Sequence, residues 1–204
     1  MIFFDIDTQI DFMKADGALY VPEAETIHGR IASLLAAAGE AEVTTISTRC
    51  AHEPGDPEFD LFPPHCLEGT PGAERLFAEL PGLPRCEVAV SAIAEPGTSL
   101  QEATHYVVKK KVFDLFANEW LDGLRRDGYF QEKDCIVFGV ATDYCVRACV
   151  LGLVEAGARV RVVGDAICGV SPTTTSETLA VWQKAGVEMT TTAEILRGIE
   201  EATR

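Results

Sequence analysis

The sequence contains no apolar run approaching the roughly 20 residues that a membrane-spanning helix needs, so we expect no membrane association. Basic residues are also scarce. The 17 Lys and Arg against 32 Asp and Glu give a net charge of -15, which argues against a nucleic-acid partner because phosphate binding needs a basic surface. The first residues, MIFFDID, contain no basic segment and no cleavage site of small residues. We therefore expect no signal peptide and a cytoplasmic location.

Disulfide-type cysteine patterns are absent as well. None of the seven cysteines forms a CxxC pair, and their number is odd and their spacing irregular, which indicates reduced thiols. The sequence has no internal repeat and no low-complexity linker. Its 204 residues are enough for one large domain with a sizeable core, so we expect a single domain over residues 1–204.

Short β-rich segments alternate with helical ones along the chain. The segments expected to be strands are 1–6, 42–48, 105–110, 134–140, 158–166 and 186–190. The expected helices are 23–38, 117–126, one that ends at Gly157, 174–185, and 191–202 with a capping box at Thr191 and Glu194. This alternation predicts an α/β fold, a three-layer αβα sandwich around a mostly parallel sheet. In such sheets, sites lie at the carboxyl ends of the strands.

Two cysteines stand four residues apart in the segment GVATDYCVRACVLGLVEAG, residues 139–157. Cys145 falls in the first turn of the expected helix, where unpaired N–H groups and the helix dipole are expected to lower the pKa of a thiol. Cys149 lies one turn further on among apolar residues, where a thiol stays protonated and inert. Helix position therefore favours Cys145 as a nucleophile. The alternative is that both thiols are packing residues.

A cysteine nucleophile needs a base and a group that stabilises developing negative charge. Asp7 follows the first expected strand and would share a sheet edge with Cys145 if the two strands are neighbours. Asp5 and Asp11 compete for the role of base, although Asp5 is still within the strand and Asp11 is typical of a turn or cap. Lys110 ends the strand HYVVKK, and an ammonium between Asp7 and Cys145 would favour the thiolate and orient the base.

Four segments resemble the isochorismatase-like cysteine hydrolases, in particular their nicotinamidase branch. DIDTQIDF is similar to the D-x-Q-x-D-F opening of that superfamily. KKVFDLF is similar to its Lys segment, in which the spacing to Asp114 and Phe116 selects Lys110. GVATDYCV and FPPHCLEGTPGAE resemble segments of the nicotinamidase branch. The motifs occur in the family order and span nearly the whole chain.

The resemblance implies a Rossmann-like fold with about six strands and a catalytic triad of Asp7, Lys110 and Cys145. It also implies a cis peptide between Val140 and Ala141 and an oxyanion hole formed by the backbone N–H groups of Ala141 and Cys145. The implied reaction is amide hydrolysis, in which Asp7 deprotonates Cys145 and the thiolate attacks a carboxamide carbon. Ammonia then leaves, and water cleaves the thioester. We expect a homo-oligomer.

In the nicotinamidase branch, a D-x-H pair, a later Glu and a later His hold a divalent metal ion that anchors the pyridine nitrogen. Carried over residue by residue, the resemblance implies His52, Glu58 and His65 as ligands, with Cys50 in the Asp position. Either Cys50 ligates as a thiolate, which would favour zinc, or it is passive and the site is weak or empty. The acidic residues that would be able to replace Glu58 are Asp56 and Asp60.

The expected substrate is a small carboxamide, nicotinamide first. Phe12 and Phe62 resemble aromatic residues that stack on the substrate in the family, and Tyr144 lies beside the nucleophile, so all three are expected to line the pocket. We expect a divalent metal, zinc first, and no organic cofactor. The alternatives are hydrolysis of another small amide or ureide, marked by the change at Cys50, and a non-catalytic small-molecule-binding or interaction domain on the same fold.

Overall fold

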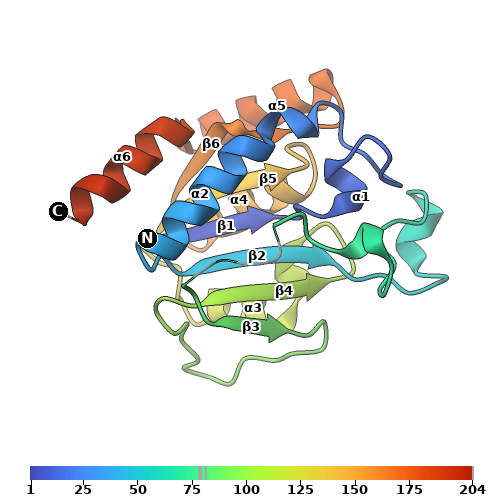
Figure 1. Cartoon of the computed structure of the whole chain (residues 1–204). Coiled ribbons are helices and arrows are strands. Elements are labelled where there is room, and N and C mark those ends of the chain that lie inside the picture. Colours follow the sequence, from blue (N-terminus) through green and yellow to red (C-terminus); the bar gives the residue numbers. More distant parts are fainter. Residues whose placement is uncertain (78–79, 81, 204) are drawn as a thin grey trace.

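The computed structural model describes residues 1–77, 80 and 82–203, and a sheet dominates this part of the chain. The sheet has seven strands in the order β3-β4-β2-β1-β5-β6-β7, and all neighbours are parallel (Figure 1). The strands are β1 (Ile2–Ile6), β2 (Thr45–Cys50), β3 (Arg85–Val88), β4 (His105–Lys110), β5 (Asp134–Val140), β6 (Arg159–Cys168) and β7 (Glu188–Thr190). β1 pairs with β2 on one side and β5 on the other, which makes its carboxyl end the switch point where such sheets form a ligand crevice.

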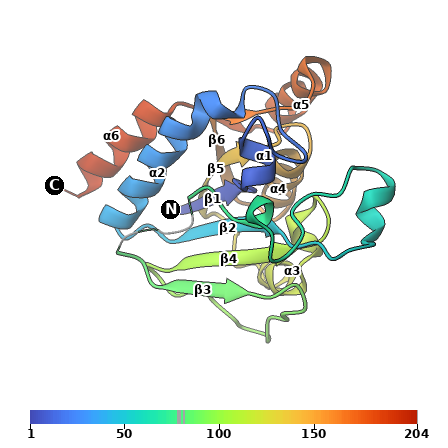
Figure 2. The same cartoon turned by 45° about the vertical axis from the view of Figure 1, so that its right-hand side comes forward.

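Helices cover both faces of the sheet. They are α1 (Ile10–Met13), α2 (His28–Glu40), α3 (Glu119–Arg126), α4 (Cys145–Glu155), α5 (Pro172–Lys184) and α6 (Thr192–Ala202). The 3₁₀ turns are η1 (Ala24–Ile27), η2 (Pro57–Asp60), η3 (Pro71–Ala73) and η4 (Leu115–Ala117). α2 and α6 bury their apolar residues in one core, while α3, α4 and α5 do so in the core on the opposite face (Figure 2). The predicted αβα architecture is confirmed.

Local sequence accounts for several of these elements. All five residues of β1 are buried, as expected for a continuous apolar strand in the middle of a covered parallel sheet. The predicted capping box at the start of α6 is present, with both the Thr191 and the Glu194 side-chain bonds formed. Asn118 caps α3 by accepting from the backbone N–H groups of Trp120 and Leu121.

The expected count of about six strands was one too low, because β3 was not predicted. Three of its four residues are exposed, so this short edge strand has no apolar pattern that would mark it. The helix expected over 23–38 starts differently from the prediction. The first turn is the 3₁₀ helix η1, and regular α-helix begins at His28 and continues to Glu40.

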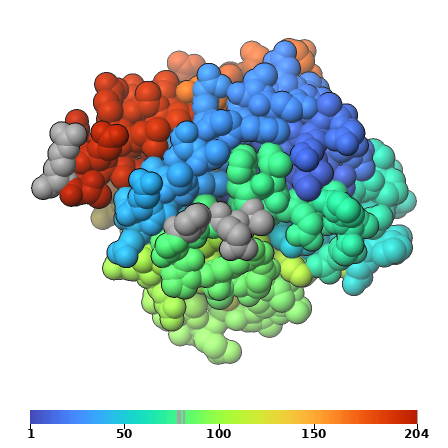
Figure 3. All heavy atoms as spheres, in the orientation of Figure 1, coloured from blue at the N-terminus to red at the C-terminus, as the bar shows by residue number. Residues whose placement is uncertain are grey.

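The segment 51–76 lies beyond the carboxyl ends of β1 and β2, on the right in Figure 1. In the space-filling view it packs against the N-terminal residues that follow β1 (Figure 3). Gln9 fixes part of this segment, since its side-chain amide donates to the carbonyl oxygens of Cys50 and Ala73, each at 2.8 Å. No helix in the described part of the chain is long and apolar enough to cross a bilayer.

Candidate active site

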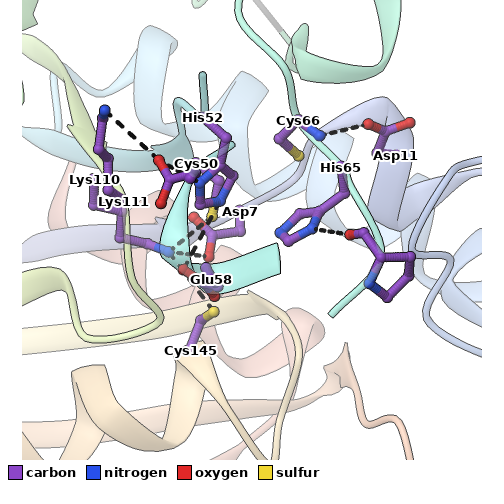
Figure 4. A network of polar contacts seen from close by, with 12 residues as sticks. Asp7, Asp11, Cys50, His52, Glu58, His65, Cys66, Lys110, Lys111 and Cys145 are labelled. Atoms are coloured by element: carbon purple, nitrogen blue, oxygen red, sulfur yellow. Dashed lines mark hydrogen bonds and ion pairs between the residues drawn. The ribbon is translucent and has the colours of Figure 1, made fainter. Parts of the chain in front are cut away.

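A buried ion pair lies at the carboxyl edge of the sheet. Lys110, the last residue of β4, places its Nζ 2.8 Å from Oδ2 of Asp7, which follows β1, and both side chains are 1% exposed (Figure 4). Thr48 donates to the other carboxylate oxygen of Asp7 at 2.7 Å. Burial favours a neutral amine, but the neighbouring groups, Asp7 first, together outweigh it and hold the pKa of Lys110 well above its usual value. Lys110 is therefore an ammonium.

Cys145 faces this pair from the first residue of α4, and its Sγ lies 3.7 Å from Lys110 Nζ (Figure 4). The expectation of a lowered thiol pKa was wrong. Burial raises the pKa of Cys145 well above its usual value, and the Asp7 charge adds to this, while Lys110 opposes it. Cys145 is therefore a thiol at rest and must lose its proton during attack. Cys149 is fully buried in the core between α4 and the sheet, away from these groups.

The backbone around Cys145 has the features that the family resemblance implies. The peptide between Val140 and Ala141 is cis. Ala141 and Cys145 both line the cavity that contains Asp7. Within the described chain, neither of their N–H groups is among the backbone bonds of turns and loops, so both are available to an oxyanion in the cavity.

The two competing aspartates have other partners. Asp5 forms a buried ion pair with Arg75, and its Oδ2 also accepts from Ser47 at 3.0 Å. Asp11 accepts from the backbone N–H groups of Ala18 at 3.1 Å and Cys66 at 2.6 Å, which ties two loops together. Of the three carboxylates, the structure therefore places only that of Asp7 against Lys110.

A group of metal-capable side chains lies next to the ion pair. One potential ligand atom each from Cys50, His52 and His65 lies within 4.8 Å of the other two, and all three residues are buried. His65 Nδ1 lies 2.8 Å from the carbonyl oxygen of Pro63, which places the proton on Nδ1 and leaves the Nε2 lone pair free. Burial lowers the pKa of both His52 and His65, which keeps the imidazoles neutral, as metal binding requires.

The acidic residues of the same loop that were considered as metal ligands lie in different positions. His52 Nε2 lies 3.9 Å from Glu58 Oε2, and its Nδ1 lies 3.3 Å from Asp56 Oδ2. Glu58 lines the cavity with Cys50 and His65, so it faces the same space, whereas Asp56 lies behind His52. Asp60 is exposed and does not join the group.

These residues fit a divalent metal ion. Both ring nitrogens of His52, Oε2 of Glu58 and Oδ2 of Asp56 are buried with no hydrogen-bond partner in the described part of the chain. Buried polar atoms are normally satisfied, so several unpaired ones on a single group indicate a missing partner. Two imidazoles, a carboxylate and a sulfur are ligands that zinc accepts. A carboxylate behind a ligating imidazole, as Asp56 is behind His52, is the usual supporting contact.

The cavity in front of Cys145 is largely apolar and has a volume of about 130 Å³. The three aromatic residues expected there, Phe12, Phe62 and Tyr144, all line it. Phe62 packs edge-on against Tyr144 with ring centroids 5.7 Å apart, and Phe12 lies 5.3 Å from the His65 ring. The remaining lining residues are Asp7, Leu19, Tyr20, Val21, Cys50, Glu58, His65, Phe113, Val140, Ala141, Cys145 and Val170.

Sequence reasoning missed two features of the site. Thr48 holds Asp7 through its hydroxyl, and nothing in the sequence distinguishes it from the other threonines of its strand. No pattern in the sequence marks His105, whose Nε2 lies 2.9 Å from Ser47 Oγ and 3.0 Å from Arg75 Nη1, next to the Asp5–Arg75 pair. Only the three-dimensional proximity of β1, β2 and β4 reveals this network.

The comparisons with known proteins agree with this geometry. The isochorismatase domain model matches residues 91–194. The nicotinamidase/pyrazinamidase of Mycobacterium tuberculosis is 32% identical over 191 residues, covering 90% of this chain and 95% of the relative.

The chain belongs to the isochorismatase family.

Two further relatives narrow its position in the family. The nicotinamidase of Escherichia coli is 27% identical over 212 residues, covering 93% of each chain. The structure of Pyrococcus horikoshii pyrazinamidase in complex with zinc has a TM-score of 0.72 and 25% identity, and it covers 93% of this chain and 98% of that one. The predicted membership of the isochorismatase-like superfamily, in its nicotinamidase branch, is therefore confirmed.

Proposed function

We propose that the protein hydrolyses nicotinamide to nicotinate and ammonia through a thioester on Cys145. The observation that carries this proposal is the position of Lys110 Nζ, 2.8 Å from Asp7 and 3.7 Å from Cys145, beside an apolar cavity. A base, a cation and a nucleophile at one point form the minimal set for cysteine-dependent amide cleavage. The nicotinamidase relatives from M. tuberculosis and E. coli support the choice of substrate.

In the first half of the reaction, Asp7 accepts the thiol proton of Cys145, and the sulfur attacks the carboxamide carbon. Lys110 balances the charge of Asp7 before transfer and that of the thiolate afterwards. The backbone N–H groups of Ala141 and Cys145 stabilise the oxyanion of the tetrahedral intermediate. Asp7 then returns its proton to the amide nitrogen, and ammonia leaves an acyl thioester.

In the second half, Asp7 accepts a proton from water, which attacks the thioester carbon. Collapse of the second tetrahedral intermediate breaks the carbon–sulfur bond. The proton held by Asp7 passes to the leaving sulfur, which restores the Cys145 thiol and releases the carboxylic acid. Because the resting thiol is protonated, both halves depend on the same base.

The proposed ligands of a divalent ion, zinc in our proposal, are His52, His65 and Glu58. When bound there, the ion would supply a Lewis acid for the ring nitrogen of the substrate. The protein itself orients the ring between the aromatic residues Phe12 and Phe62, which lets the carboxamide face Cys145. Asp56 Oδ2, 3.3 Å behind His52 Nδ1, would support the orientation of that ring when an ion is bound.

The cavity wall favours an uncharged substrate over a carboxylate-bearing one. Among the described residues, no Lys or Arg lines the cavity, and the charged side chains on its wall are the carboxylates of Asp7 and Glu58. The protein side chains of the wall therefore offer no cation to the carboxylate of an anionic ureide, which would have to pair with the proposed metal ion itself. A neutral aromatic amide meets apolar side chains instead.

Ammonia release from purified protein tests the proposal, with nicotinamide, benzamide and N-carbamoylglycine as substrates. Benzamide keeps the ring and the amide but lacks the ring nitrogen, and N-carbamoylglycine carries a carboxylate. We expect nicotinamide to be turned over best, and Cys145→Ala to lower kcat at least about 10³-fold. Cys149→Ala is the matched control and should keep most of the activity. Absence of nicotinamide turnover by the wild-type chain would refute the proposal.

We also propose that residues 1–204 form one hydrolase domain, located in the cytoplasm and assembled as a homo-oligomer. Light scattering on the eluate of a size-exclusion column gives the oligomer mass directly. A single cooperative unfolding transition, coincident for fluorescence and circular dichroism, would support one domain. Two separated transitions would contradict it.

A further inference from the structure

Cys50 is the residue in the site whose role the proposed mechanism leaves open. It ends β2, is 2% exposed, and lines the same cavity as Glu58, His65 and Cys145. Its sulfur belongs to the group in which ligand atoms of Cys50, His52 and His65 lie within 4.8 Å of one another (Figure 4). Cys50 packs in the hydrophobic core, as Cys149 does in the core on the opposite face, but its sulfur also accepts a hydrogen bond from Lys110 Nζ.

Hydrogen bonds hold the backbone of Cys50 firmly in this position. Gln9 accepts from the N–H of Cys50 at 2.7 Å and donates to its carbonyl at 2.8 Å, so one side-chain amide fixes both polar groups of the residue. The next two residues are fixed as well, because Ala51 N–H donates to the carbonyl of Lys110 at 2.9 Å and His52 N–H to that of Cys66 at 3.1 Å. A fixed backbone of this kind suits a ligand whose side chain alone must turn to meet the ion.

Burial raises the pKa of the Cys50 thiol to about 12, so the sulfur is protonated without a metal ion, but its polar contact suits the anion that a bound ion would create. Lys110 Nζ donates to Cys50 Sγ at 3.2 Å, and the same ammonium contacts Asp7 and Cys145. A hydrogen bond from an ammonium to a metal-bound sulfur is the outer contact that orients a ligand and stabilises its charge.

Charge balance in the buried site also favours a thiolate at Cys50. Lys110 is matched by Asp7. A divalent ion next to Glu58 would keep one positive charge that no other carboxylate balances, because Asp56 lies behind His52 and its Oδ2 is 3.6 Å from Lys111 Nζ, and isolated buried charges are strongly unfavourable. A Cys50 thiolate supplies that anion, and its proton leaves to solvent as the ion binds.

We propose that Cys50 is a thiolate ligand of the metal ion, together with His52 and His65, and that it makes the site select zinc over oxygen-preferring ions such as manganese. The inference rests on the metal site of the proposed function. A tetrahedral zinc site has donor atoms roughly 3.3–3.6 Å apart, given zinc–sulfur and zinc–nitrogen bonds of about 2.3 and 2.0–2.1 Å. The ligand atoms of the observed group lie within 4.8 Å of one another, so the side chains would have to turn inward as the ion binds. Thiolate ligands favour zinc, whereas carboxylate ligands suit manganese and magnesium.

X-ray absorption at the zinc edge of the full-length zinc-loaded protein tests the ligand without any substitution at position 50. We expect one sulfur scatterer at about 2.3 Å in addition to nitrogen and oxygen neighbours at about 2.0–2.1 Å. The Cys145→Ser and Cys66→Ser variants must give the same spectrum, since these cysteines carry the other sulfur atoms near the site. A shell of only nitrogen and oxygen, or loss of the sulfur in Cys145→Ser, overturns the inference.

Cobalt substitution and metal competition give a second, independent readout. The Co²⁺ form of the wild-type protein should show a sulfur-to-cobalt charge-transfer band in the near ultraviolet. Cys50→Asp should lose that band and lower the ratio of zinc to manganese affinity by at least about tenfold. Cys66→Ser is the matched control, because Cys66 is a buried cysteine beside His65 that is outside the ligand group. An unchanged band in Cys50→Asp, or its loss in Cys66→Ser alone, contradicts the assignment.

The test of Cys50 as a metal ligand can fail or succeed independently of the test of the proposed function. The absorption spectrum and the cobalt band report on the ligand set whether or not the protein turns over nicotinamide. A chain with the sulfur scatterer and no amidase activity would keep the Cys50 assignment and remove the nicotinamidase proposal. An active amidase without the sulfur scatterer would keep the nicotinamidase proposal and remove the Cys50 assignment.

Discussion

Replacing Lys110 with Met should remove activity and also destabilise the fold strongly. Lys110 and Asp7 are each 1% exposed and 2.8 Å apart. Met has a similar length but no charge, so the Lys110→Met variant leaves the Asp7 carboxylate buried without its cation. Breaking a buried ion pair in this way costs about 3–5 kcal/mol. For a chain of this size, about 2–4 °C are lost per kcal/mol, so Tm should fall by about 6–20 °C.

The double variant Asp7→Asn, Lys110→Met separates this charge effect from a packing effect. It contains neither buried charge, and the amide introduced at position 7 can still accept from Thr48, whose hydroxyl donates to Asp7 at 2.7 Å in the wild type. We therefore expect the double variant to be more stable than Lys110→Met by about 2 kcal/mol or more. It should be inactive, because the base is gone.

Urea unfolding of the wild type, both single variants and the double variant measures this coupling. The four proteins are compared in the presence of a chelator, because a bound metal ion would add its own stabilisation. Nicotinamide hydrolysis is followed in parallel. If the double variant lost the sum of the two single losses within about 0.5 kcal/mol, the two side chains would be energetically independent. The ion pair would then not be the reason for the instability.

Three further predictions follow from the same contacts. Thr48→Val should keep the fold and lower kcat/KM about tenfold or more, because a hydrogen bond to a charged group is worth about 1.5–3 kcal/mol. Thr48→Ser, which keeps the hydroxyl, should retain the rate. Equal rates of the two variants would contradict this prediction. Phe62→Ala should raise the KM for nicotinamide by about two- to tenfold through lost ring contact, and an unchanged KM would remove Phe62 from the pocket. His105 has its pKa lowered to about 3 by burial and by the neighbouring Arg75 charge. The unfolded state therefore binds the additional proton as pH falls below about 6.5, and stability decreases by up to about 1.4 kcal/mol per pH unit down to about 3. His105→Gln should show a correspondingly smaller loss in urea titrations between pH values of about 7 and 4, and an identical slope in both proteins would refute this.

The residues that meet at the site were predictable where they follow apolar strands. β1, β4 and β5 are continuous buried runs in the sequence, and Asp7, Lys110 and Cys145 each stand at or just beyond the end of one. The carboxyl ends of parallel strands share one edge, so strand assignment alone places these residues on that edge. The choice of Asp7 over Asp5 and Asp11 could not be made from the strands alone. It depends on the side-chain and backbone partners that each carboxylate has in the folded chain.

The protonation state of Cys145 was not predictable in this way. Its position in the first turn of α4 was foreseen, and a helix N-terminus lowers a thiol pKa. The sequence gives no measure of how deeply the sulfur is buried or how close Asp7 lies. In the folded chain both effects favour the thiol and prevail. The same limitation applies to His105 and Arg75, whose contact joins residues 30 positions apart in the chain.

The strand order explains why the residue at position 50 matters to the catalytic lysine. The neighbours β4, β2, β1 and β5 carry, in that order, Lys110, Cys50, Asp7 and the loop to Cys145 at their carboxyl ends. Lys110 is therefore two strands away from Asp7 and must extend across the end of β2 to reach it. Cys50 is its register partner there and meets the ammonium at 3.2 Å. Any metal ligand at this position is thus also a neighbour of Lys110, so a change at Cys50 should alter the reactivity of Cys145 as well as metal binding.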